Sequence, residues 1–101
     1  MRIVLSVGGN ALLKRGEAMS AATQQKNIAE AVQAMKPLIE EHEVLITHGN
    51  GPQVGLLALQ AQNYKEVPPY PFDILGAESQ AMVGYMLLEA LQRALPEKSF
   101  V

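Results

Sequence analysis

The segment HGNGPQVG, residues 48–55, combines residue types that suit the binding of a small anion. Gly49 and Gly51 let the backbone turn sharply or approach a ligand closely, and Pro52 is tolerated in the first turn of a helix. Backbone N–H groups near Gly51 and Gln53, together with the helix dipole, favour a phosphate or carboxylate by about 0.3–1 kcal/mol per interaction. The pattern therefore predicts an anion-binding loop where a helix begins.

A second glycine-rich turn, VGGNA at Val7–Ala11, ends an earlier apolar run. In a parallel sheet the carboxyl ends of neighbouring strands meet at one edge, where open α/β folds bind their ligands. Two such turns together predict a cradle for a small anion. Taken alone, VGGNA is equally well explained as a tight turn with Asn10 as its turn-forming residue.

Charged and polar side chains near these turns have two interpretations each. Lys14 and Arg15 could reach an anion from the first turn, although exposed charges are more often only solvated. His48 either orients the second turn or simply ends a strand. His42 is interpreted as a solvated residue at a helix end.

A dinucleotide site is a competing hypothesis, because Gly49, Gly51 and Gly55 give the spacing GxGxxxG, close to the Rossmann fingerprint. That fingerprint needs an acidic residue about 20 positions further on, where this chain has a proline-rich stretch around Glu66. The P-loop pattern is absent. The only aspartate is Asp73, and the two histidines lack metal-ligand spacing, so no metal site is predicted.

Composition indicates at most one globular domain. The chain has 101 residues, of which 49% are hydrophobic and 18% charged. Its net charge of −2, without a basic cluster, argues against a nucleic-acid partner. The absence of cysteine excludes disulfides and thiolate metal sites. The first apolar stretch is too short for a signal peptide or a membrane span, so we expect a cytoplasmic protein.

The elements that must position the turns begin with a strand–helix–strand unit. A buried strand is expected at residues 3–7 and another at residues 43–47. Between them, Ser20 could cap a long helix. Pro37 is expected to kink this helix or to end its regular part early. The apolar stripe of the helix has helical spacing and consists of Ile28, Val32, Met35 and Ile39.

The second half of the chain is expected to be helical. One helix should run from Gln53 to Gln62, followed by an extended connection with three prolines at residues 63–72. A last helix, opened by Asp73 as a candidate cap and stopped by Pro96, is apolar nearly all round and should be buried in a domain or at a subunit interface. The residues expected to meet another subunit or the rest of the fold are Met82, Tyr85, Met86 and Glu89.

The final SFV is expected to start a third strand. Two strands alone do not make a stable parallel sheet, which needs further strands and helices on both faces. We therefore expect the chain to be the front part of a larger α/β domain.

Three segments, VGGNAL, ITHGNGPQVG and FDILGAESQAMVGYML, resemble carbamate kinase, a branch of the amino-acid kinase fold. The resemblance extends over essentially all 101 residues. It implies a three-layer αβα sandwich with a mainly parallel sheet, in which residues 1–101 form the N-terminal, substrate-side part and the nucleotide-binding half is absent. It also implies a homodimer, and reversible phosphate transfer between ATP and carbamate that gives carbamoyl phosphate and ADP, with Mg²⁺ carried on the nucleotide.

The resemblance also implies roles for individual residues. Gly9, Asn10 and Gly51 would act in catalysis. The wider fold family has a lysine two residues before its glycine pair, where this chain has Ser6; carbamate kinases are similar in lacking it and take theirs from further along the chain. The implied substrate-binding residues all belong to the two glycine turns: Gly8, Gly9, Asn10, Ala11, Gly49, Asn50 and Gly51.

Three functions stay open from the sequence. The first is a carbamate-kinase-like phosphotransferase, of which this chain is an incomplete catalytic unit, with arginine or purine-nitrogen breakdown as the implied pathway. The second is a non-catalytic remnant or dimerisation module of the same fold. The third is a dinucleotide-binding fragment.

Overall fold

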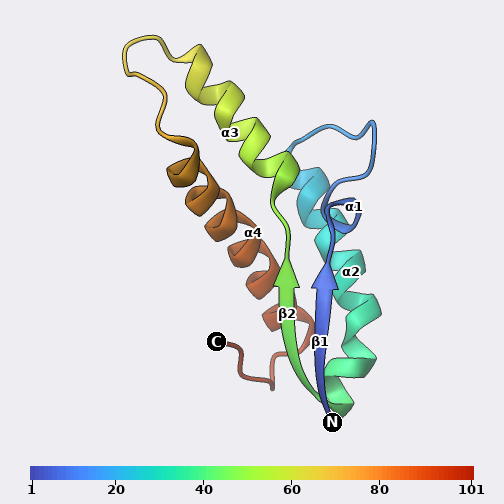
Figure 1. Cartoon of the computed structure of the whole chain (residues 1–101). Helices are drawn as coiled ribbons and strands as arrows, with labels where there is room; N and C mark the ends of the chain where they lie inside the picture. The colour runs from blue at the N-terminus through green and yellow to red at the C-terminus, as the bar shows by residue number, and fades with distance from the viewer.

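Two parallel strands and the helix between them form the centre of the chain (Figure 1). The computed structural model describes residues 1–101, except for the side chain of Asn10. Strand β1 (Arg2–Val7) pairs with β2 (Glu43–His48) in register, from Arg2 opposite Glu43 to Val7 opposite His48. Helix α2 (Ala21–Glu41) connects them. The expected strand–helix–strand unit is therefore confirmed.

Helix α2 begins where the sequence predicted, because the Ser20 hydroxyl accepts a hydrogen bond from the N–H of Thr23 at 3.1 Å. Of the two outcomes expected of Pro37, an early end of the helix is wrong, and a kink stays a prediction. The helix continues to Glu41, and the N–H of His42 closes its last turn on the carbonyl of Leu38 at 2.9 Å. Ile39, beyond the proline, is buried in the core, and this burial offsets the hydrogen bond that proline cannot donate.

Helices α3 (Gly51–Asn63) and α4 (Phe72–Ala94) form a hairpin that projects beyond the strands (Figure 1). The hairpin lengthens the molecule, which measures 50 × 25 × 20 Å. Helix α4 ends before Pro96, as predicted, but its cap is Pro71 and not Asp73. Asp73 lies in the first turn, where its carboxylate faces the positive end of the helix dipole.

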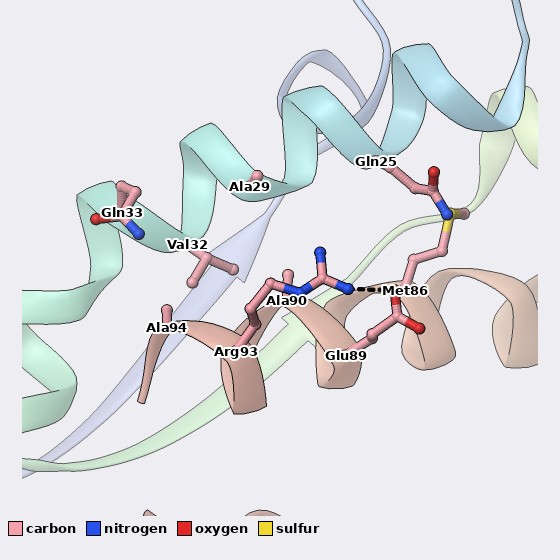
Figure 2. Close-up of a pocket in the computed structure, with 9 residues that line it drawn as sticks. All are labelled: Gln25, Ala29, Val32, Gln33, Met86, Glu89, Ala90, Arg93 and Ala94. Atoms are coloured by element: carbon pink, nitrogen blue, oxygen red, sulfur yellow. Dashed lines mark hydrogen bonds and ion pairs between the residues drawn. The ribbon is translucent and has the colours of Figure 1, made fainter. Parts of the chain in front are cut away.

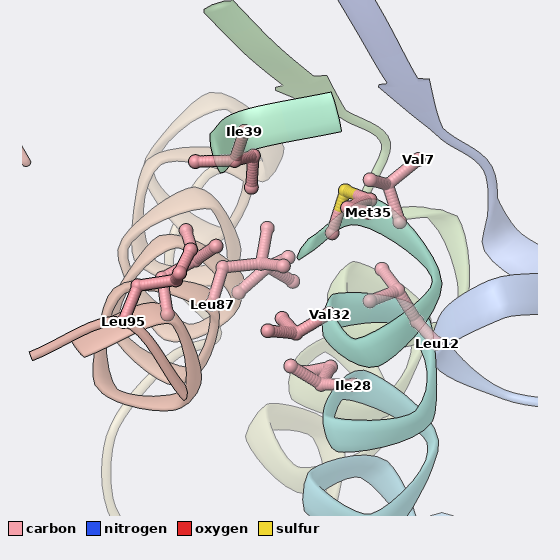
Figure 3. Close-up of a cluster of buried hydrophobic side chains, with 10 residues drawn as sticks. Val7, Leu12, Ile28, Val32, Met35, Ile39, Leu87 and Leu95 are labelled. Atoms are coloured by element: carbon pink, nitrogen blue, oxygen red, sulfur yellow. The ribbon is translucent and has the colours of Figure 1, made fainter. Parts of the chain in front are cut away.

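The core lies between the sheet and two helices, α2 and α4, which cover the same face of the strands (Figure 3). On the other face, Val4 and Leu45 are 64% and 63% exposed. The described residues thus form the parallel sheet of an α/β fold and one helical layer, and the second layer of the expected sandwich is not made by them. The buried apolar residues of the core cluster are Val7, Leu12, Ile28, Val32, Met35, Ile39, Val83, Leu87, Leu91 and Leu95.

Helix α4 buries only one stripe within this chain, although its sequence is apolar nearly all round. The stripe is spaced by four residues and consists of Leu75, Ser79, Val83, Leu87 and Leu91. Phe72, Ile74, Tyr85 and Leu88 remain exposed. Complete burial of this helix inside the chain is therefore ruled out.

Residues 99–101 do not form the expected third strand. No backbone hydrogen bond joins them to β1 or β2 in the described part of the chain. Phe100 instead packs against the core with its side chain. An apolar segment forms a strand only when its backbone can hydrogen-bond to the edge of another strand. Here the Phe100 side chain packs against the core and the backbone makes no such pairing. Within the described residues, no helix is both long and apolar enough to cross a membrane.

Candidate anion-binding site at the carboxyl edge of the sheet

The two glycine turns meet at one edge of the sheet, as the sequence predicted. Val7 and His48, the last residues of β1 and β2, are paired in the register. The N–H of Gly49 donates to the carbonyl of Val7 at 3.3 Å. A Cβ atom on Gly9 would lie 3.9 Å from Cδ of Pro52, so the starts of α1 and α3 face each other closely.

The first turn contains a single helical turn that the sequence did not predict, α1 (Gly9–Leu12). The N–H of Ala11 donates to the carbonyl of Gly8 at 3.1 Å, and Leu12 is fully buried. Ala11 packs against the core, so only its backbone is left to meet a substrate. The side chain of Asn10 lies outside the described part of the structure, and its implied role stays a prediction.

The second turn presents unbonded backbone donors at the start of α3. The N–H of Val54 donates to the carbonyl of Asn50 at 2.9 Å and begins the helical hydrogen-bond pattern. The N–H groups of Gly51 and Gln53 have no acceptor among the described residues, and Pro52 has no N–H. Gln53 is fully buried, so of the two only the N–H of the exposed Gly51 is open to a ligand in this structure. Because this donor lies at the positive end of the helix dipole, it can bind an anion.

The polar side chains of the second turn bond within the chain. His48 Nδ1 lies 3.0 Å from the carbonyl oxygen of Gly49, so the histidine does contact the turn. The amide of Gln53, which is fully buried, donates to the side-chain oxygen of Gln24 on α2 at 2.9 Å. The turn is thereby attached to the helix behind the sheet.

Asn50 attaches the same turn to α4. Its amide nitrogen donates to the hydroxyl of Ser79 at 2.5 Å and to the carbonyl of Gly76 at 3.4 Å. A side-chain amide has two N–H donors, and both are used within the chain. Contact between Asn50 and a substrate, which the sequence resemblance implies, therefore falls to the backbone in this arrangement.

The glycines of the two turns are not required by backbone conformation. Of the glycines in the chain, only Gly16 has a positive φ, at 84°. A Cβ atom on Gly8, Gly49 or Gly51 would have no other atom within 4 Å. Neither strain nor crowding inside the chain explains three residues without side chains here. Glycine at these positions leaves room for close approach by a ligand or by another part of the protein.

Lys14 and Glu17, two charged residues near the first turn, bond within the chain, and the reach of Arg15 to an anion stays a prediction. Lys14 Nζ lies 3.6 Å from a carboxylate oxygen of Glu30 on α2, so it is not directed at the cradle. Glu17 accepts hydrogen bonds from the backbone N–H of Lys14 at 2.7 Å and from the amide of Asn27 at 2.8 Å. These bonds, the first being the stronger cause, lower the pKa of Glu17 below its ordinary value.

Among the described residues, no group of three histidine, aspartate or glutamate side chains could hold a metal ion. A separate groove of about 280 Å³ lies between α2 and α4 (Figure 2). Its cation, Arg93, is 3.3 Å from Glu89, and no residue of either glycine turn lines it. The groove is thus distinct from the cradle.

Comparison with known proteins agrees with these features. Residues 1–99 match the model of the amino acid kinase family. Carbamate kinase from Rhizobium meliloti is 57% identical over 96 residues, which cover 95% of this chain and 30% of that protein. Carbamate kinase from Escherichia coli K12 is 58% identical over 89 residues, which cover 88% of this chain and 30% of that protein.

A solved structure is also similar. Carbamate kinase from Giardia lamblia bound to AMP-PNP superimposes with a TM-score of 0.89 at 35% identity, covering 94% of this chain and 34% of that one. The chain thus spans about 30% of the length of the curated relatives it matches. The family match over residues 1–99 and the structural likeness agree with the two neighbouring glycine turns on a parallel sheet. The chain therefore belongs to the amino acid kinase family.

Proposed function

We propose that residues 1–101 are the N-terminal, substrate-side part of a carbamate-kinase-type phosphotransferase whose nucleotide-binding half lies outside these residues. The reaction is reversible phosphate transfer between ATP and carbamate in the cytoplasm, by a homodimer, in arginine or purine-nitrogen breakdown. The observation that carries the proposal is the set of glycines at the cradle, which neither backbone strain nor crowding within the chain requires. The similarity to carbamate kinases supports the choice of this reaction.

The chemistry requires positioning and charge stabilisation more than covalent help from the protein. In the direction of ATP formation, the bond between phosphorus and the carbamoyl oxygen breaks while a terminal oxygen of ADP bonds to phosphorus. Carbamate leaves with the electron pair of the broken bond. The N–H group of Gly51 holds a negatively charged oxygen of the carbamoyl phosphate.

Gly8 and Gly9 contribute by allowing the transferred phosphoryl group close to the backbone of the first turn. The Mg²⁺ that accompanies the nucleotide neutralises phosphate charge when bound. The nucleotide, by this proposal, meets the cradle from residues beyond 101. In this proposal Gly9 contributes to catalysis by positioning the backbone of the first turn, and Gly51 does so at the start of α3, while the role of Asn10 stays a prediction.

The geometry disfavours a dinucleotide site. Glu66, the candidate ribose ligand, lies in the connection between α3 and α4, at the end of α3 away from the glycine turn (Figure 1). Helix α3 has 13 residues, so it separates the two by about 20 Å at a rise of about 1.5 Å per residue. A dimerisation module remains the second candidate, because α4 keeps exposed apolar side chains such as Phe72 and Tyr85.

A hybrid enzyme tests the proposal. This chain replaces the matching segment of the Rhizobium meliloti carbamate kinase, and ATP formation from carbamoyl phosphate and ADP is measured. We expect turnover within about tenfold of the parent enzyme, since the proposed cradle is retained. A folded hybrid without turnover would favour the non-catalytic alternative. Calorimetry of residues 1–101 alone should detect no NAD or ATP binding, and micromolar NAD affinity would revive the dinucleotide hypothesis.

A further inference from the structure

Asn50 is followed by glycine, and it is the only asparagine of the chain with this neighbour. The other asparagines precede alanine, isoleucine or tyrosine. The backbone nitrogen of the residue after an asparagine can attack the side-chain carbonyl carbon and close a five-membered succinimide ring. A side chain on that next residue crowds the attack, and glycine has none. The pair Asn50–Gly51 therefore has the sequence that most favours loss of the side-chain amide.

The attacking nitrogen is accessible in the structure. Gly51 is exposed, and its N–H has no acceptor among the described residues. A Cβ atom on Gly51 would meet no other atom within 4 Å, so the space around this residue is open. Base from the solvent can therefore reach the N–H and remove the proton that the attack requires.

The backbone conformation of Asn50 keeps the two reacting atoms apart. The ring can close only when the Gly51 nitrogen lies on the same side of the Asn50 Cα–C bond as Cβ. With ψ at 18°, this nitrogen is instead nearly eclipsed with the backbone nitrogen of Asn50. Rotation about ψ would turn the Asn50 carbonyl away from the N–H of Val54, to which it is bonded at 2.9 Å. The reaction therefore requires local opening of the first turn of α3.

The side chain of Asn50 is also held within the fold. Its amide nitrogen, which is the leaving group, donates to the hydroxyl of Ser79 at 2.5 Å and to the carbonyl of Gly76 at 3.4 Å. Ser79 is fully buried, and its own hydroxyl proton goes to the carbonyl of Gly76 at 2.8 Å. An opening that frees the turn also separates Asn50 from α4, so these bonds add to the free energy of opening.

We propose that Asn50 is a deamidation site whose reaction is slowed by the folded turn, through the carbonyl bond to Val54 and the amide bonds to α4. The Gly51 nitrogen bonds to Cγ of Asn50 and gives up its proton. The Cγ–Nδ2 bond breaks, and Nδ2 leaves as ammonia. Water then opens the ring at one of its two carbonyls, which gives aspartate or isoaspartate. This proposal does not depend on the proposed function.

Deamidation would change the second glycine turn irreversibly. Either product has a carboxylate where the chain had an amide, and a carboxylate has no N–H to donate to the carbonyl of Gly76. Isoaspartate also carries the main chain through the former side chain, which adds a methylene to the backbone of the turn. The modified turn thereby loses its attachment to α4.

The test follows Asn50 by peptide mass spectrometry in the purified chain, kept in mildly alkaline buffer with and without urea. Asn63, exposed at the end of α3 and followed by tyrosine, is the control within the same molecule. In urea we expect Asn50 to deamidate at least about tenfold faster than Asn63, because glycine does not crowd the attack. Folding should slow Asn50 by at least about tenfold. Equal rates for the two asparagines in urea, or equal rates for Asn50 with and without urea, would overturn the proposal.

Ser79→Ala tests the hold from α4, because it removes one of the two acceptors of the Asn50 amide. We expect deamidation of Asn50 in the folded variant to be about three- to tenfold faster than in the native chain, as loss of one hydrogen bond implies. Exchange of the His42 N–H, at the end of α2, should stay native and so exclude general unfolding. Ser99→Ala, at an exposed serine outside the helices, is the matched control and should change neither rate. A native rate at Asn50 in folded Ser79→Ala overturns the role of α4.

Hydrogen exchange in the native chain gives a measurement that needs no variant. The Val54 N–H is released by the same opening that lets Asn50 rotate. The factor by which folding slows deamidation of Asn50 should therefore agree within about tenfold with the factor by which it slows exchange of the Val54 N–H. Deamidation much faster than this opening permits would show that the closed turn reacts, and the proposed protection would be wrong. This comparison decides the question even if Ser79→Ala does not fold.

Discussion

Substitution of Gly51 should show whether glycine at this position is required for ligand binding or for stability of the fold. Gly51 is the first residue of α3, and its φ lies outside the left-handed region. A Cβ atom there would meet no other atom within 4 Å. The Cα–Cβ bond of a helical residue tilts toward the helix N-terminus, so a side chain at Gly51 extends toward the space in front of the Gly51 N–H. The chain has room for this side chain, but the side chain would keep an anion from approaching the backbone.

The expected magnitudes have opposite signs for stability and for binding. Gly51→Ala should raise the free energy of unfolding by about 0.4–1 kcal/mol, because alanine reduces the freedom of the unfolded chain. Loss of one hydrogen bond to a charged ligand oxygen costs about 1.5–3 kcal/mol, which weakens phosphate binding by roughly 10- to 150-fold. Gly51→Val adds two further methyl groups at the same place and should remove detectable binding and, in the hybrid kinase, turnover.

The matched control is Gly55→Ala, on the next turn of the same helix, where a Cβ atom also meets open space. It should raise stability by a similar amount and leave phosphate binding unchanged. Urea unfolding measures the first quantity and an NMR phosphate titration the second. Native affinity in a folded Gly51→Val variant would refute the argument that the glycine is there for a ligand. A loss of stability in Gly51→Ala would show that the fold itself needs glycine.

Two further predictions concern charge and association. Hydrogen bonds from the Lys14 N–H and the Asn27 amide lower the pKa of Glu17. The ionised carboxylate therefore stabilises the fold at pH values above the ordinary pKa of 4.5. This stability is lost as the pH falls through the lowered pKa. Glu17→Gln should therefore reduce urea resistance at neutral pH and make little difference in strong acid, whereas an equal deficit at both would contradict the assignment. Tyr85, which is 67% exposed on α4, should contribute to a dimer contact. Tyr85→Asp should therefore shift sedimentation toward the monomer, and Gln92→Asp should not. A native chain that is monomeric at high micromolar concentration would disprove this contact.

The positions of the glycine turns could be predicted from the sequence because their signals are local. Each turn follows a short β-branched run, and parallel strands necessarily bring their carboxyl ends to one edge. The single turn of α1 was missed because four residues carry no helical periodicity. Its formation depends on Leu12, which is fully buried against α2, and such burial is visible only in three dimensions.

The anchoring of the second turn could not be predicted, because its partners are distant in the chain. Asn50 and Ser79 are 29 residues apart, as are Gln53 and Gln24. A polar residue in a glycine-rich turn is naturally assigned to the ligand when its neighbours are unknown. One signal was present: Ser79 interrupts an otherwise apolar stripe spaced by four residues, and a buried hydroxyl needs a partner.

Errors at element ends have the same origin in tertiary contacts. Pro37 does not end α2 because Ile39 beyond it is buried. Met86, which is expected to meet another subunit or the rest of the fold, packs partly against the core and lines the groove between α2 and α4 (Figure 2). Its contact with a subunit stays a prediction, and Tyr85, the exposed neighbour, is the position at which association is tested.

The alternation of residue types in HGNGPQ has a physical explanation in this arrangement. Asn50 and Gln53 turn their polar side chains inward to α4 and α2, while Gly49 and Gly51 leave the outer surface of the turn free of side chains. An anion that is held by backbone N–H groups meets donors whose direction is set by the fold and not by rotamer choice. The cost of such a site is that the backbone must be held rigidly from behind. Glycine supplies access and little rigidity, so the inward-facing amides must supply it, and the site therefore extends to residues that no ligand touches.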